Sequence, residues 1–145
     1  MISFIATPET RFIEVFARRG LVVDFSGSWI LPRIIGVQKA KELMMTATEI
    51  SGTKLNDYGV LYKLVEKPDL DTELDNLVNL LDQQSFISIC MIKDQIRKGL
   101  NTNFDESLSN ETDNQNSRFV HSDVMEGMSA FIEKRQPEYK NTLDE

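Results

Sequence analysis

The sequence predicts an α/β chain in two parts, with short strands and helices over residues 1–66 and helices alone over residues 67–145. Three observations lead to this prediction. Short apolar runs of strand composition occur only in the first part, Lys67-Pro68-Asp69 interrupts the chain, and beyond it apolar residues recur at helical spacing. A length of 145 residues with 41% apolar residues is enough for a hydrophobic core.

Four runs of the first part have strand composition. Ile2–Ala6 is a short apolar run closed by a Thr-Pro turn, and Arg11–Phe16 has strand composition with four large apolar residues. Leu21–Val23 follows a glycine and ends at an aspartate, while Val60–Val65 reads as the last strand of the chain. We expect these runs to form the strands of the N-terminal part.

Helices are predicted between the strands. Trp29–Ile35 is helical by residue type, but Pro32 removes one helix hydrogen bond, so we expect a kink or a late start. Val37–Thr46 consists of good helix formers. Ser51 is a suitable cap for a short helix that Gly59 ends.

The second part begins with two predicted helices. In the first, four apolar residues share one helical face: Leu74, Leu77, Val78 and Leu81. The next, Phe86–Lys98, is apolar on more than one side, so we expect it to lie between packing partners.

Two further helices follow, each with a capping signal. Asn103 with Glu106 resembles a capping box, and the polar run 107–118 predicts an exposed or loosely held helix. Asp123 with Glu126 is a second capping signal. The apolar stripe behind it is Val124, Met125, Met128, Phe131 and Ile132, and we expect a frayed tail over residues 141–145.

Charge and composition exclude several classes of function. The net charge of −7 makes nucleic acid and anionic membranes unsuitable partners. With one cysteine, Cys90, and one histidine, His121, neither an internal disulfide nor a Cys/His zinc site can form. We expect Cys90 to pack in the core. The start lacks a secretory signal and no apolar run reaches the length of a membrane span, so we expect a cytoplasmic protein.

Asp24 is the candidate catalytic residue. It stands between an apolar run and a glycine turn, directly before a helical segment, where backbone dipoles can hold a charged or reacting group. A carboxylate in such a place can move a proton at a carbon beside an activated carbonyl. On the residues alone, the alternative is that Asp24 only caps the following helix. Glu14 is the nearest upstream carboxylate, and we expect it on the surface.

Two separated motifs resemble the crotonase family of enoyl-CoA hydratases and isomerases. The first is the turn Val22-Val23-Asp24-Phe25-Ser26-Gly27-Ser28-Trp29, which continues as Leu31-Pro32-Arg33. The second is Ser122-Asp123-x-x-Glu126-Gly127-x-x-Ala130-Phe131-x-Glu133-Lys134-Arg135-x-Pro137. Together with the segments between them, they extend the resemblance over nearly the whole chain.

The resemblance implies the C-terminal part of a crotonase-like ββα spiral core over residues 1–66. Residues 67–145 would form a helical oligomerisation region, and a homo-oligomer such as a trimer is the expected assembly. It also implies action on acyl-CoA thioesters, with Asp24 as acid/base. Hydratases of the family carry a second glutamate where this chain has Phe16, so the resemblance favours double-bond isomerisation.

The resemblance further implies that Phe131 and Lys134 contact the nucleotide of coenzyme A, which is part of the substrate, and no other cofactor or metal is expected. The alternative is that Phe131 fills a helical core and Lys134 is a solvated charge. The family's two backbone N–H donors for the thioester oxygen lie in an N-terminal half that this sequence does not match. We therefore expect this chain alone to be inactive. A truncated remnant, or a non-enzymatic subunit that needs a separate N-terminal half, is the competing hypothesis.

Overall fold

The computed structural model describes residues 4–140, and they form a mostly helical α/β structure with two small sheets. The chain divides into two compact units, Met1–Asp75 and Asn76–Glu145. Helix α4 (Leu70–Asp82) begins in the first unit and ends in the second. The Lys67-Pro68-Asp69 break forms the 3-10 helix η2 (Lys67–Asp69) directly before α4.

The strands are shorter than predicted. β1 (Ile5–Ala6) runs parallel to β4 (Lys63–Leu64), and β2 (Arg11–Phe12) runs antiparallel to β3 (Ile50–Ser51). The register places Ile5 opposite Lys63 and Phe12 opposite Ile50. A chain segment counts as a strand only where a neighbour completes its hydrogen bonds, and these pairings are two residues long. The prediction of a strand that begins at Ile2 lies partly outside the described residues.

The predicted strand over Leu21–Val23 is wrong. Residues 21–24 form an irregular loop, in which Leu21 is exposed and Val22 is 86% exposed. Apolar residues favour a strand only when a neighbouring strand pairs with them. No strand within residues 4–140 pairs with this segment, so Leu21 and Val22 face outward and Val23 is only partly buried.

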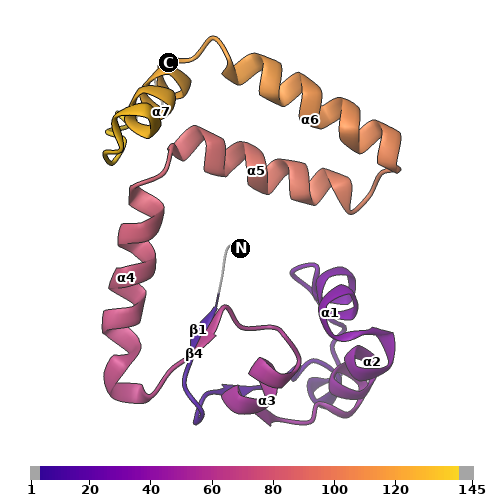
Figure 1. Cartoon of the computed structure of the whole chain (residues 1–145). Helices are drawn as coiled ribbons and strands as arrows, with labels where there is room; N and C mark the ends of the chain where they lie inside the picture. The colour runs from indigo at the N-terminus through magenta and orange to yellow at the C-terminus, as the bar shows by residue number, and fades with distance from the viewer. Residues whose placement is uncertain (1–3, 141–145) are drawn as a thin grey trace. The chain divides into compact units, whose positions relative to one another are not determined.

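Four helical segments lie between the strands of the first unit: η1 (Ala17–Arg19), α1 (Gly27–Ile35), α2 (Val37–Thr46) and α3 (Gly52–Asp57). Helix α1 begins five residues before Pro32, so the expected late start is not observed. Helices α1 and α2 lie side by side (Figure 1) and enclose a core of Leu31, Ala40 and Leu43. Five partly buried residues pack against that core: Phe12, Ile35, Met44, Ile50 and Tyr58.

A close backbone contact fixes the start of α3. A Cβ atom on Gly52 would lie 1.9 Å from the carbonyl oxygen of Thr7, so no larger residue fits without movement of the backbone. The Oγ of Ser51 accepts a hydrogen bond from the Lys54 N–H at 3.2 Å. The predicted cap at Ser51 is confirmed, and the contact joins α3 to the loop after β1.

The second unit consists of α5 (Phe86–Gly99), α6 (Phe104–Arg118) and α7 (Ser122–Glu133), together with the end of α4. Helices α5 and α6 lie side by side as an antiparallel hairpin (Figure 1). The Oδ1 of Asn103 accepts from the Glu106 N–H at 2.9 Å, which confirms the predicted cap of α6. The polar helix α6 is mostly exposed, as predicted.

Three other predictions for this unit are wrong. His121, not Asp123, caps α7, because its Nδ1 accepts from the Asp123 N–H at 3.2 Å. Helix α5 is not enclosed on all its apolar sides, since Phe86, Ile92 and Ile96 are exposed. Cys90 is also exposed rather than buried in a core. The predicted frayed tail lies outside the described residues. Over residues 4–140, no helix has both the length and the apolar character needed to cross a membrane.

Candidate functional site

Asp24 lies in the loop between η1 and α1 and does not cap the helix. The N-cap residue of α1 is Ser26, and no side chain in the described chain makes a capping hydrogen bond there. Asp24 instead contributes its backbone carbonyl, which accepts from the Gly27 N–H at 2.8 Å. The capping alternative for Asp24 is therefore wrong, and the residue is exposed.

The two residues after Asp24 have strained backbones. Phe25 has a φ of 48° and Ser26 a φ of 61°, both in the left-handed region that favours glycine. Such a conformation costs about 1–2 kcal/mol for a residue with a Cβ atom. Phe25 is also 94% exposed. Strain and an exposed aromatic side chain at one turn are features that accumulate where a protein binds something.

A second carboxylate interacts with Asp24 through space. Glu14 is partly buried, so the expected surface position is wrong. Burial raises the pKa of the Glu14 carboxyl, and the negative charge of Asp24 raises it further. Removal from water disfavours the charged form, and a neighbouring like charge does the same. The charge of Asp24 therefore acts on the Glu14 carboxyl, as the smaller of these two causes.

Phe16 occupies the start of η1 and is partly buried. Its backbone carbonyl accepts from the N–H groups of Arg19 at 2.9 Å and Leu21 at 3.0 Å, which closes the turn that leads to Asp24. Its side chain has no group that can gain or lose a proton. Phe16 therefore adds no acid or base to Glu14 and Asp24.

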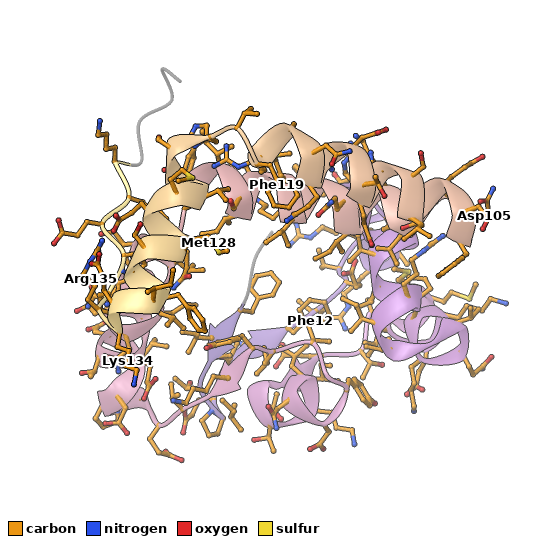
Figure 2. The ribbon with its side chains drawn as sticks, turned by 45° about the horizontal axis from the view of Figure 1, so that its top comes forward. Phe12, Asp105, Phe119, Met128, Lys134 and Arg135 are labelled. Carbon is orange, nitrogen blue, oxygen red and sulfur yellow. The ribbon has the colours of Figure 1, made fainter. Side chains whose placement is uncertain are left out.

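The other predicted site residues, Phe131 and Lys134, lie at the end of α7. Figure 2 shows Lys134 and Arg135 together where this helix ends. Phe131 is 82% exposed, so the alternative in which it fills a helical core is not observed in this structure. Lys134 has a φ of 54° and is also exposed. A left-handed residue after a helix is usually glycine, and lysine there costs about 1 kcal/mol.

The chain turns back along α7 after Lys134, and we call residues 134–139 the C-terminal hook. Arg135 forms a two-pronged ion pair with Glu126, with Nη1–Oε1 2.6 Å and Nη2–Oε2 3.0 Å. The N–H of Glu138 donates to the same Oε1 at 2.7 Å. These three bonds lower the pKa of Glu126 to about 2, with the Arg135 bond as the largest cause.

Gly127 lets the hook approach α7. A Cβ atom at this position would lie 3.0 Å from the phenolic oxygen of Tyr139. Most residues of the second motif therefore have a role inside the unit. Within the described chain, no hydrogen bond or ion pair involves the Phe131 or Lys134 side chain, which leaves both available to another molecule.

A buried polar cluster was missed by sequence reasoning. Asp123 accepts a short hydrogen bond from the Ser85 hydroxyl and pairs with Arg118, with a 3.1 Å Nη2–Oδ2 distance. Arg118 also lies 3.0 Å from Nδ1 of His121. The Ser85 hydroxyl donates to a carboxylate rather than to the imidazole, so it is not arranged as a nucleophile. The cluster joins helix ends and is structural.

Metal-ligating side chains do not gather in the described residues, where no group of three or more His, Cys, Asp or Glu could hold an ion. The exposed Cys90 belongs to a shallow depression between α5 and α6, together with Phe86, Ile87, Met91, Asp94 and Asn114.

Comparison with known proteins assigns the family. The pattern of the enoyl-CoA hydratase/isomerase family matches residues 3–142, and this chain belongs to that family. A trans-2-decenoyl-[acyl-carrier-protein] isomerase of Streptococcus mutans is 33% identical over 93% of this chain and 51% of its own length. A 1,2-epoxyphenylacetyl-CoA isomerase of Escherichia coli is 29% identical over 93% and 52%.

Solved structures agree with this assignment. An enoyl-CoA hydratase from Polaromonas sp. JS666 is 29% identical with a TM-score of 0.86, over 94% of this chain and 53% of its own. An enoyl-CoA hydratase subunit from Geobacillus kaustophilus has a TM-score of 0.88 at 25% identity, over 97% and 55%. The fold thus matches part of a crotonase fold. The chain spans about half the length of the curated relatives it matches.

Proposed function

We propose that this chain supplies the acid/base carboxylate and part of the coenzyme-binding surface of an enoyl-thioester isomerase. The Asp24 turn carries the proposal. Its carboxylate is exposed, is not used as a helix cap, precedes two strained residues, and helps to raise the pKa of Glu14. Two of the similar proteins are named as isomerases and others as hydratases, and the first two support the isomerase part of the proposal.

One carboxylate is sufficient for a double-bond shift. Asp24 takes a proton from the carbon next to the thioester carbonyl, and the electron pair spreads into the enolate. The protonated Asp24 then returns that proton two carbons further along the acyl chain. The double bond moves by one position, and no atom is gained or lost. Stabilisation of the enolate oxygen needs N–H donors, which we assign to the part of the relatives that this chain does not match.

Hydration needs more than this arrangement provides. Addition of water across the double bond is assisted by a second group that positions and deprotonates the water. Phe16 stands where hydratases of the family carry that group, and its ring cannot act as a base. Phe16 is therefore the residue that favours isomerisation over hydration.

Phe131 and Lys134 are proposed to contact the coenzyme A portion of the substrate. An exposed aromatic ring offers a face on which a purine can stack, and an ammonium group attracts phosphate. Coenzyme A enters here as part of the substrate. The Streptococcus relative is named for an acyl-carrier-protein thioester and the Escherichia relative for a CoA thioester, so the carrier itself is a variable to test.

The experiment joins this chain with the N-terminal half of a related enzyme, either as a second polypeptide or by fusion. We expect the pair to isomerise enoyl-CoA, whereas the 145 residues alone show no turnover above background. Asp24→Asn should lower the activity of the pair by about two to four orders of magnitude. It should leave the fold intact, because the side chain is exposed and caps nothing.

Matched variants make the result specific. Asp113→Asn changes an exposed aspartate of α6 and should leave activity within about twofold. Phe16→Glu should raise the ratio of hydration to isomerisation. An active pair that Asp24→Asn leaves unimpaired would contradict the proposal, and a pair that never gains activity would favour the competing hypothesis of a non-enzymatic subunit.

A further inference from the structure

The backbone at Lys134 belongs to a defined helix-ending motif. The N–H of Lys134 bonds to the carbonyl of Phe131 at 3.3 Å, and the N–H of Arg135 bonds to the carbonyl of Ala130 at 3.0 Å. This pair of bonds forms only when the first residue after the helix, here Lys134, has a left-handed backbone. Glycine suits that position best, yet the chain has a lysine there. A side chain at this strained position indicates a use for the side chain itself.

Arg135 is occupied by contacts inside the unit. Besides its two bonds to Glu126, its Nε donates to Oε2 of Glu133 at 2.6 Å, and its Nη1 donates to the carbonyl of Gln136 at 3.1 Å. Lys134, the adjacent cation, has no such contact among the described residues. Of these two neighbouring charges, Arg135 therefore holds the hook and Lys134 faces outward.

Glu126 is the fixed point of the hook. It lies in the middle of α7 and binds the hook at two places, Arg135 and the N–H of Glu138. The hook also passes close to Gly127, where an added Cβ atom would lie 3.0 Å from the phenolic oxygen of Tyr139. A segment bonded to one helix at Arg135 and Glu138, and close to that helix at Gly127, has little freedom to rotate about Lys134.

We propose that Glu126 and Arg135 are positioning residues for the coenzyme portion of the substrate, because they hold Lys134 in the left-handed conformation that directs its ammonium group. This inference rests on the proposed function, in which Lys134 contacts coenzyme A. Neither Glu126 nor Arg135 touches the substrate in this scheme. Their effect passes through the backbone of residue 134.

Hydrogen exchange tests, without any ligand, whether Glu126 holds the backbone of the hook. In Glu126→Gln, the Glu138 amide loses a charged acceptor and the Arg135 side chain loses its ion pair. The backbone amides of Glu138 and Arg135 should therefore exchange faster than in the parent chain. The matched control is Glu133→Gln, which removes a more exposed carboxylate with one bond to Arg135. The control should leave the Glu138 amide unchanged. Equal exchange of that amide in the parent chain and Glu126→Gln would overturn the proposal.

Kinetics of this chain paired with the N-terminal half of a related enzyme test whether the hook affects binding of the coenzyme portion. Lys134→Ala, Glu126→Gln and Arg135→Lys should each raise KM for an enoyl-CoA by about tenfold, the equivalent of one lost charge contact, with kcat nearly unchanged. The double variant Glu126→Gln with Lys134→Ala should be no worse than Lys134→Ala alone, because both act through one ammonium group. A purely structural role of Glu126 would instead give additive losses.

Lys134→Gly separates conformation from contact. It should raise the melting temperature, because glycine suits the left-handed position, while KM rises as in Lys134→Ala. If Lys134→Ala leaves KM unchanged, the coenzyme contact of the proposed function is wrong. If Lys134→Ala raises KM but Glu126→Gln and Arg135→Lys do not, the positioning role is wrong and the coenzyme contact stands.

Discussion

Arg118 and Asp123 form an ion pair across the turn between α6 and α7, and each side chain is only 11% exposed. The other ion pairs of the described residues are more exposed at both partners, apart from the His121–Asp123 contact in the same cluster, which is more exposed at His121 alone. Ser85, at the start of α5, donates to the same carboxylate oxygen. One aspartate therefore joins the end of α6 and the starts of α5 and α7.

Loss of this carboxylate should be costly. Asp123→Ala leaves the Arg118 guanidinium buried without its partner, and removal of one partner from a buried pair costs about 3–5 kcal/mol. Urea unfolding would measure the change. As a control, Glu42→Ala breaks the exposed pair with Lys39 and should cost less than about 1 kcal/mol. Equal losses in the two variants would mean that burial of the Arg118–Asp123 pair has no energetic consequence.

The strain beside Asp24 predicts a substitution that stabilises the chain. Ser26→Gly relieves a left-handed serine and should raise the free energy of unfolding by about 0.5–1 kcal/mol, after allowance for the greater freedom of glycine in the unfolded chain. Ser109→Gly, in the middle of α6, should lower it by about 0.5 kcal/mol. Thermal and urea unfolding of both variants check the sign. Destabilisation by Ser26→Gly would show that the turn is not strained as its φ angle indicates.

The coupled carboxylates predict a pH dependence of stability. Burial, followed by the charge of Asp24, raises the folded-state pKa of Glu14 above its ordinary value of 4.5. Ionisation therefore costs more in the folded state, and the cost appears as pH rises through 4.5 and the raised pKa. Glu14→Gln should stabilise the chain near neutral pH, and this gain should vanish below pH 4.5.

Asp24→Asn provides the companion measurement. It removes the second cause of the shift, so the pKa of Glu14, followed by carboxyl NMR, should fall while remaining above 4.5. Glu9→Gln, an exposed glutamate in the same part of the chain, is the control for a general charge effect. A Glu14 pKa that does not respond to Asp24→Asn would show that the two carboxylates are not coupled.

Local signals in the sequence predicted much of the helical structure. The caps at Ser51 and Asn103 are confirmed because a cap bonds only to the next turn of its own helix. The prediction of a Leu21–Val23 strand was wrong for the opposite reason, since a strand depends on a neighbour that can come from anywhere in the chain. Its composition alone could not show whether that neighbour was present.

Candidate site residues could be predicted from the sequence where they belong to a continuous motif. Asp24, Phe131 and Lys134 were selected from two such motifs, and their roles stay predictions. Ser85 and Asp123, which are 38 positions apart, show no pattern in the sequence. The capping role of Asp24 failed because two left-handed residues move the helix start to Ser26, and composition does not predict left-handed phenylalanine and serine.

The last prediction is that this chain assembles into oligomers in solution. Ala130 is the one fully buried apolar residue among the described residues of the second unit, whereas Met125, Met128 and Ile132 form an exposed stripe on one face of α7. So much exposed apolar surface favours association, and we propose a trimer because the family resemblance implies that this region associates. Light scattering after size-exclusion chromatography should give a mass above 16.6 kDa at micromolar concentration. Met125→Glu with Ile132→Glu should lower that mass by placing charges in the stripe, while Asn116→Glu on the polar helix α6 should not. A folded monomer of the parent chain would contradict the prediction and show that these apolar side chains need no partner.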